Sequence, residues 1–226
     1  MNEIERAATA EFDRWADAGR GESMHRGHLA VTTPVLDEWA LTDSDRVLDV
    51  GCGNGWAVRL MLERGAGAGI GVDLSPKMID QAGSLGSGSF HVASGERLPL
   101  PDDHVSHVLS VESLYYYTDP VAALREWARV ARPGARLAVV IELFAENRGS
   151  AVWADVLDVH AHLWGEAKWR QALTEAGWVA ASRRILHPGP LKPEADFEPS
   201  KYWPTYGHYV DYREAGALAL TGTLSG

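Results

Sequence analysis

From about residue 46 onward, short aliphatic runs alternate with segments in which apolar residues recur at helical spacing. The runs are Arg46–Val50, Ala68–Val72, Ser89–Val92, Val105–Val111 and Arg136–Ile141. The helical segments between them are Trp56–Arg64, Pro76–Ala82 and Asp119–Ala131. Strand–helix–strand alternation at this period predicts an α/β fold, with a largely parallel sheet and helices on both of its faces.

The region after the fifth run follows a different pattern. Apolar spacing predicts helices at Ala151–Trp164 and Glu166–Ala176, the second of them ended by a glycine. Two further strands are expected at residues 180–186 and 217–224. They are separated by an insert rich in proline, tyrosine and tryptophan, Pro188–Gly216, whose rings suit a core, an aromatic ligand or a homodimer surface equally well.

Charge and composition exclude several classes of function. The chain has 31 acidic against 21 basic residues, a formal charge of −10, which repels nucleic-acid phosphates. Its one cysteine, Cys52, rules out an intrachain disulfide and a cysteine-based zinc site. No apolar run approaches the roughly 18–20 residues that span a bilayer, and the acidic first segment lacks the layout of a secretion signal. We therefore expect a cytoplasmic protein with no nucleic-acid partner and no membrane span.

The most informative segment is VLDVGCGNG, residues 47–55, where a buried strand runs into a glycine-rich turn and then a helix. Glycines in such a turn allow positive φ angles and let a ligand approach the backbone. Asp73 ends the next strand, 22 positions after Gly51. A carboxylate at that place can accept hydrogen bonds from both hydroxyls of a ribose, so the segment predicts a nucleotide-type ligand.

Two residues indicate which nucleotide this is. Trp56 occupies the position where a dinucleotide fingerprint has its third glycine. Asp49 places a carboxylate where a pyrophosphate would be repelled but an ammonium group would be attracted. The pattern thus favours S-adenosylmethionine over a nicotinamide cofactor, although a nicotinamide-dependent oxidoreductase stays an alternative.

Four segments, VLDVGCGNG, GVDLSPKMI, ASGERLPLPDD and VLSVESLYYY, together resemble the class I S-adenosylmethionine-dependent methyltransferases. The resemblance is to the broad group that includes ubiquinone/menaquinone-type enzymes and many small-molecule methyltransferases, and it covers roughly residues 45–142. It implies a Rossmann-like sheet of seven strands, mostly parallel with one antiparallel strand inserted beside the fifth. The strands expected at 180–186 and 217–224 fit that reversed hairpin.

The resemblance also implies which residues meet S-adenosylmethionine. Asp49 would face its amino group through water, Asp73 its ribose hydroxyls, and the Val111 carbonyl its ammonium. Ser94 stands where the family often has an acid that accepts a hydrogen bond from adenine, and a neutral hydroxyl accepts that bond without charge assistance. The complete set is Asp49, Gly51, Cys52, Gly53, Asp73, Leu74, Ser94, Gly95, Glu96 and Val111.

No catalytic residue is assigned, because methyl transfer from a sulfonium can be catalysed largely by positioning. Motifs typical of amino-methylating nucleic-acid enzymes, cytosine methyltransferases and protein arginine methyltransferases are missing from the sequence. We therefore expect a small organic acceptor, no metal site, and methyl transfer in line; a cofactor-binding protein without methyl transfer is the alternative. The side chains expected near the reacting methyl are Met24, His25, His28, Glu112, Tyr115, Tyr116, Tyr117, His160, His162 and Trp164.

These segments predict one domain, residues 1–226. Residues 1–45 would form a helical cover, with amphipathic helices at Ile4–Ala18 and Pro34–Leu41 joined by a glycine- and histidine-rich loop. Residues 46–142 would form the cofactor-binding core. Residues 143–226 would add the substrate-side helices, the aromatic insert and the reversed hairpin.

Overall fold

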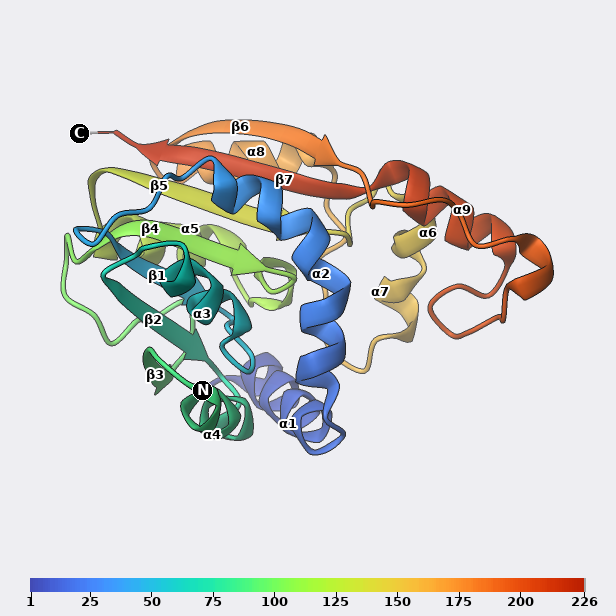
Figure 1. The fold of residues 1–226 in the computed structure, drawn as a ribbon, viewed down its shortest axis with the longest axis horizontal. Helices are drawn as coiled ribbons and strands as arrows, with labels where there is room; N and C mark the ends of the chain where they lie inside the picture. The colour runs from blue at the N-terminus through green and yellow to red at the C-terminus, as the bar shows by residue number, and fades with distance from the viewer. Residues whose placement is uncertain (226) are drawn as a thin grey trace.

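The computed structural model describes residues 1–225, and a single seven-stranded sheet organises them (Figure 1). Its strand order is β3-β2-β1-β4-β5-β7-β6, and β7 pairs antiparallel with both of its neighbours while β1 to β5 pair in parallel. The strands are β1 Arg46–Val50, β2 Ala68–Asp73, β3 Ser89–Val92, β4 Val105–Val111, β5 Ala131–Ile141, β6 Trp178–Ile185 and β7 Ala217–Leu224. The expected Rossmann-like sheet, with its antiparallel strand beside the fifth, is confirmed.

Helices cover both faces of the sheet. On one face, α2 and α3 pack against apolar residues of β1, β4, β5 and β7; on the other, α5 and α8 pack against the alternate residues of the same strands. The helices are α1 Glu3–Asp17, α2 Arg20–Asp37, α3 Trp56–Glu63, α4 Pro76–Leu85, α5 Pro120–Val130, α6 Arg148–Ala151, α7 Trp153–Val156, α8 Glu166–Glu175 and α9 Tyr206–Ala215. Two 3₁₀ turns, η1 Leu114–Tyr116 and η2 Glu194–Asp196, complete the elements.

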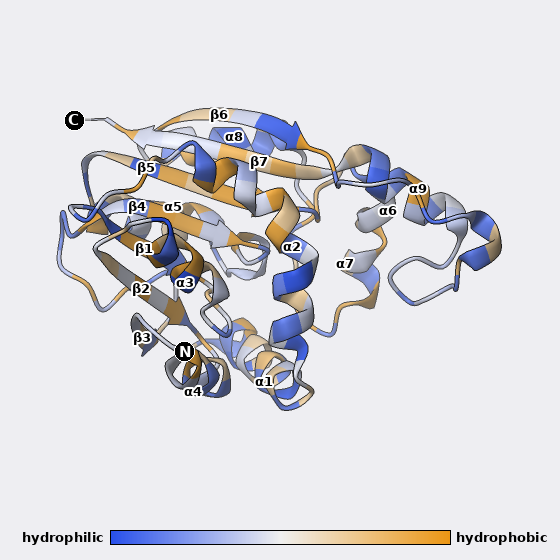
Figure 2. Ribbon diagram, in the orientation of Figure 1, coloured by the Kyte–Doolittle hydropathy of each residue, from blue (hydrophilic) through white to orange (hydrophobic). Residues whose placement is uncertain are grey.

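Each central strand is buried on both faces, which explains its continuous aliphatic sequence. Along β4, Val108 enters the core under α5 and α8, whereas the next residue, Leu109, enters the core under α2 and α3. This alternation follows from the two-residue period of a strand. Figure 2 shows the hydrophobic residues concentrated along the strands and along the helix faces that meet them.

The amino-terminal prediction was wrong in one respect. Instead of a loop followed by a helix at Pro34–Leu41, α2 runs without interruption from Arg20 to Asp37 and carries Pro34 inside it. Val31, Val35 and Leu36 of this helix are fully buried against the sheet. Their burial outweighs the weak helix propensity of the glycines and the lost backbone donor of the proline.

The carboxyl-terminal predictions also needed correction. The helix expected at Ala151–Trp164 is limited to the short α6 and α7, and residues 157–165 are irregular. The backbone there bonds to other elements, since His162 N donates to the Tyr115 carbonyl at 2.8 Å. The aromatic insert contains a helix, α9, that the sequence did not predict. β5 begins at Ala131, five residues early, with an irregular register against β4.

Candidate functional site

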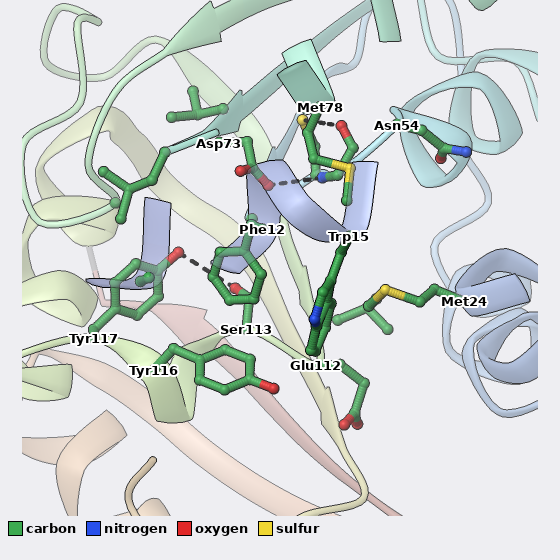
Figure 3. A pocket seen from close by; sticks show the side chains of 18 of the residues that line it. Phe12, Trp15, Met24, Asn54, Asp73, Met78, Glu112, Ser113, Tyr116 and Tyr117 are labelled. Carbon is green, nitrogen blue, oxygen red and sulfur yellow. Dashed lines mark hydrogen bonds between the residues drawn. The ribbon is translucent and has the colours of Figure 1, made fainter. Parts of the chain in front are cut away.

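A cavity lies at the carboxyl ends of β1, β2 and β4, beneath α1 and the first turns of α2 (Figure 3). It holds about 930 Å³ of space that no atom fills, part of it open to solvent. β1 lies between β2 and β4, so the strand order reverses beside it, and ligands bind at such a point in open α/β sheets. The lining residues are Glu5, Ala8, Phe12, Trp15, Gly21, Met24, His28, Gly51, Cys52, Gly53, Asn54, Trp56, Val72, Asp73, Leu74, Met78, Ala93, Gly95, Glu96, Val111, Glu112, Ser113, Tyr116, Tyr117 and Thr118.

The glycine turn after β1 forms part of the cavity floor. Gly51 has a φ of +80°, and a Cβ added to it would lie 2.2 Å from Ser113 Oγ. Gly53 also has a positive φ, +51°, but a Cβ added there would meet nothing within 4 Å. Gly51 is therefore required by close packing, whereas Gly53 leaves the backbone open toward the cavity.

Asp73 sits at the end of β2 with its carboxylate fixed by the neighbouring backbone. Its Oδ2 accepts a hydrogen bond from Gly53 N, and its Oδ1 accepts one from Ser75 N, both at 2.9 Å. Burial raises the pKa of Asp73, although these backbone donors oppose the shift. Each carboxylate oxygen keeps a free lone pair for a further donor, which suits a pair of neighbouring hydroxyls.

Two oxygen atoms near the glycine turn are buried without a hydrogen-bond partner among the described residues. Asp49 is 2% exposed and its Oδ1 is unpaired; Asn54 is 4% exposed and its Oδ1 is also unpaired. Burial, and the charge of Asp73, raise the pKa of Asp49 to about 8. Buried acceptors without donors are unfavourable, so both oxygens favour a polar or cationic ligand, or ordered water, beside them.

Two of the residues that the sequence assigned to the cofactor lie outside the cavity wall: Asp49 and Ser94 are buried behind it, and the remaining assigned residues line it. Ser94 Oγ accepts a hydrogen bond from Glu96 N at 3.2 Å. Glu5 of α1, 4% exposed, lines the cavity near Ser94, whose hydroxyl helps to lower the pKa of Glu5 against the effect of burial. Position 94 thus lacks the acid that the family often has there, but the Glu5 carboxylate of α1 lies nearby. The sequence did not indicate that α1 and position 94 would meet.

Aromatic side chains from α1 and η1 form one wall of the cavity. The Phe12 ring meets the Trp15 and Tyr116 rings edge-on, with centroids 5.3 Å and 5.2 Å apart (Figure 3). The helix that carries Phe12 and Trp15 is fixed to α4, because Gln81 Nε2 donates to the Ala16 carbonyl at 2.9 Å. This wall gives the cavity an apolar surface that excludes water.

Glu112 follows β4 at the end of the cavity away from Asp73. It has a φ of +52°, which is rare for a residue with a side chain. Its carboxylate accepts hydrogen bonds from the Tyr115 hydroxyl and from Glu142 N, both at 2.6 Å. Burial, and the nearby charge of Glu142, raise the pKa of Glu112 to about 7, although His28 opposes this.

Glu142 is the centre of a buried polar cluster behind Glu112. Its carboxylate lies 3.3 Å from His28 Nδ1, 2.9 Å from His187 Nε2 and 2.9 Å from the Tyr212 hydroxyl. Burial opposes its ionisation, but the two histidines lower its pKa strongly. Burial would lower the pKa of His28, yet the nearby Glu142 carboxylate raises it to about 9. The pair is therefore a carboxylate facing an imidazolium at neutral pH.

The structure separates the side chains expected near the reacting methyl. Met24, His28, Glu112, Tyr116 and Tyr117 line the cavity. The others do not: the His25 ring stacks on Trp56, the Tyr115 hydroxyl is bonded to Glu112, and His160, His162 and Trp164 contact one another elsewhere. Sequence reasoning missed Glu142, His187 and Tyr212, which carry no motif and come from distant segments. Ligand-type atoms of His28, Glu112 and Glu142 lie within 4.8 Å of one another, a grouping that no spacing in the sequence signals.

Comparisons with known proteins agree with this geometry. Residues 48–139 match the family model described as a methyltransferase domain. The 27-O-demethylrifamycin SV methyltransferase of Amycolatopsis mediterranei is 32% identical over 53% of this chain and 51% of its own. The O-methyltransferase resE of Aspergillus sclerotiorum is 32% identical over 55% of this chain and 50% of its own. The matches therefore span about half the length of these curated relatives.

One solved structure matches along almost the whole chain. The methyltransferase of Haloferax volcanii, in complex with the Trm112 methyltransferase activator, is 32% identical with a TM-score of 0.88. The match covers 96% of this chain and 98% of that one. Separately, within residues 1–225 no helix combines the length and the hydropathy needed to cross a membrane.

Proposed function

We propose, from the premise that this chain belongs to the class I S-adenosylmethionine-dependent methyltransferases, that it methylates a hydroxyl oxygen of a small organic molecule. The observation that carries the proposal is the cavity itself, in which Asp73 lies at one end and Glu112 at the other, beneath an aromatic wall. Membership of this family sets aside the nicotinamide-dependent oxidoreductase that the glycine turn alone left open.

The residues present fit S-adenosylmethionine. Gly53 leaves open backbone toward the cavity, and Asp73 offers two oriented acceptors for ribose hydroxyls. The unpaired buried oxygens of Asp49 and Asn54 call for donors of the kind that an ammonium group or its bridging water provides. When bound, S-adenosylmethionine supplies a methyl group on a positively charged sulfur. Asp49, Gly53, Asn54 and Asp73 would hold it.

The acceptor is inferred from the opposite end of the cavity. Trp15 and Tyr116 offer flat apolar surfaces toward Glu112, Phe12 lies between them and Asp73, and Glu112 and His28 add polar groups to the lining. Apolar walls with a few polar groups are typical of sites for small organic ligands. Two of the relatives are named as acting on oxygen, which supports a hydroxyl acceptor over a nitrogen, sulfur or carbon one.

We also propose that residues 1–30 act as a cover over the bound ligands. Glu5, Phe12 and Trp15 of α1, and Met24 and His28 of α2, face the cavity from above the sheet. Because these side chains lie over the cavity, the cover would move during ligand binding and then exclude water.

The full-length match favours a second candidate function. The Haloferax volcanii methyltransferase was solved with an activator protein, so a protein partner and a macromolecular substrate are consistent with this fold. Mixing this chain with purified Haloferax Trm112 and measuring the mass of the product by light scattering tests this candidate. A heterodimer would support it; a lone chain, or the homodimer that is one of the roles open to the aromatic insert, would favour the small-molecule function.

Calorimetry followed by a product assay tests the proposed function. We expect S-adenosylmethionine and S-adenosylhomocysteine to bind with one site per chain, and NAD not to bind. A panel of phenols, alcohols, amines and thiols with deuterated-methyl S-adenosylmethionine should then give labelled product from a hydroxyl compound, by mass spectrometry. Binding without any labelled product would instead support a cofactor-binding protein, and binding of NAD alone would contradict the proposal.

A further inference from the structure

Resting on the proposed methyl transfer to a hydroxyl, we propose that Glu112 is the general base that takes the acceptor's proton. We assign Glu142 and His28 as positioning residues behind it. Glu112 lies at the end of the cavity away from Asp73, where its neighbour Val111 is the one residue expected to contact the cofactor.

The backbone aims Glu112 into the cavity at a cost. A residue with a side chain is disfavoured in the left-handed region, and such strain is concentrated at functional sites. Here Glu112 N donates to the Val140 carbonyl at 2.9 Å, which fixes the strained turn at the end of β4. Figure 3 shows the carboxylate beyond Trp15 and Tyr116, on the far side of the cavity from Asp73.

Two donors hold the carboxylate in one orientation. The Tyr115 hydroxyl bonds to Oε2 and Glu142 N bonds to Oε1, both at 2.6 Å, so each oxygen has one bond and a free lone pair. Because Glu112 lines the cavity, these lone pairs can meet a ligand without any movement of the side chain. A fixed, desolvated acceptor is what proton transfer from a bound hydroxyl requires.

The surroundings of Glu112 make its proton exchangeable near neutral pH. Burial and the Glu142 carboxylate disfavour its charged form, and the His28 imidazolium favours it. A carboxylate whose pKa lies near the working pH can accept a proton and later release it. The titratable groups that face it are Glu142 after β5, His28 on α2, Tyr115 and Tyr116 on η1, and Tyr212 on α9.

The reaction step balances with Glu112 as the proton acceptor. The acceptor's hydroxyl oxygen forms a bond to the methyl carbon, the carbon–sulfur bond breaks, and its electron pair stays on sulfur. The hydroxyl proton moves to a Glu112 oxygen. One carboxylate and one sulfonium become a neutral carboxyl and a neutral thioether, so charge is conserved. The acceptor class that needs this base is a neutral hydroxyl, a phenol or an alcohol, rather than an anion that is already deprotonated.

The test uses two ligands that need no acceptor. Sinefungin carries an amine, protonated at neutral pH, where S-adenosylmethionine carries its methyl group, whereas S-adenosylhomocysteine has nothing there. If the Glu112 carboxylate faces that position, wild-type protein should prefer sinefungin. In Glu112→Gln the preference should fall about tenfold to a hundredfold, the range for one hydrogen-bonded charge pair. Contacts common to both ligands, such as those of Asp49 and Asp73, cancel in the ratio of the two affinities.

The Gln substitution is close to isosteric, and its amide can still bond with the Tyr115 hydroxyl and Glu142 N. Glu63→Gln, an exposed change on α3 with the same loss of charge, is the matched control and should leave the ratio unchanged. The wild-type preference should also rise from about pH 6 to about pH 8, as Glu112 loses its proton.

A measurement on wild-type protein alone covers the case in which Glu112→Gln fails to fold. Calorimetry in buffers of different ionisation enthalpy should show that sinefungin releases more protons than S-adenosylhomocysteine below about pH 7. Equal proton release, an unchanged ratio in folded Glu112→Gln, or a tightly bound divalent metal ion in the purified protein would each overturn the assignment. If neither ligand binds wild-type protein, it is the proposed function that fails.

Discussion

The two ends of the cavity are built in opposite ways. At the Asp73 end, the structure comes from short contiguous segments, and the buried oxygens of Asp49 and Asn54 have no hydrogen-bond partner within residues 1–225. At the Glu112 end, the contacts come from separate elements: Glu142 accepts a hydrogen bond from the Tyr212 hydroxyl and donates one from its backbone N to Glu112, and both His28 and His187 lie at ion-pair distance from it. The first end therefore leaves buried acceptors for a polar ligand, whereas the second surrounds its two carboxylates with donors and charges from the protein itself, and Glu112 there can exchange a proton.

Gly51→Ala should have the largest effect, because it disturbs the backbone turn on which the Asp73 end of the cavity is built. The new methyl group would lie 2.2 Å from Ser113 Oγ, and alanine is strained at a φ of +80°. We expect a loss of roughly 2–4 kcal/mol in the free energy of unfolding by urea denaturation, and no measurable S-adenosylhomocysteine binding.

Gly53→Ala is the matched control, because its added methyl meets nothing within 4 Å and only its φ of +51° is unfavourable. It should cost about 1 kcal/mol. Similar losses for the two variants would mean that packing against Ser113 is not what requires Gly51.

Asp73→Ala should lower the affinity for S-adenosylhomocysteine by about tenfold to a hundredfold, because it removes the acceptor for two ribose hydroxyls. Since the carboxylate also holds Gly53 N and Ser75 N, stability should fall as well. Calorimetry and thermal unfolding measure the two effects. Asp80→Ala, an exposed loss of charge on α4, should alter neither. An unchanged affinity in Asp73→Ala would place the ribose elsewhere.

Asp49→Asn should make the ligand-free protein more stable at pH 8 and above. Burial raises the pKa of this carboxyl from 3.8 to about 8, so the folded chain binds a proton that the unfolded chain has lost. The free energy of unfolding therefore falls as pH rises from about 4 to about 8, and stays low above that.

The asparagine variant lacks this penalty, so its melting temperature should exceed the wild-type value by several degrees at pH 9 and match it near pH 4. Scanning calorimetry at both pH values measures the difference. Its affinity for S-adenosylmethionine should fall severalfold, because the ammonium group loses a charged partner. A stability gain that is equal at pH 4 and pH 9 would show that ionisation of Asp49 is not the cause.

The smallest effect is expected for the cover, residues 1–30, which lies over both ends of the cavity. Saturating S-adenosylhomocysteine should slow tryptic cleavage at Arg20 and Arg26 by about two- to fivefold, since a ligand beneath α1 and α2 favours the closed arrangement. Cleavage at Lys201, which is exposed in the aromatic insert, is the internal control and should be unchanged. Equal rates at the arginines with and without ligand would make residues 1–30 a fixed part of the fold.

The sequence by itself determined the central sheet and the Asp73 end of the cavity. Strand periodicity, the glycine turn and the acid after the second strand are local patterns, and their geometry depends on few distant contacts. The strands at Arg46–Val50, Ser89–Val92, Val105–Val111 and residues 217–224 were therefore predicted within a residue.

Only the tertiary structure decided the Glu112 end. Nothing local to His28, Glu142, His187 or Tyr212 signals that they meet, because their proximity arises from the packing of α2, the end of β5 and α9 around one buried carboxylate. The same holds for α2, whose glycines and proline indicate a loop until the sheet buries its apolar face. Local patterns determine local geometry, whereas a buried charge acquires its partners, and with them its pKa, from the whole fold.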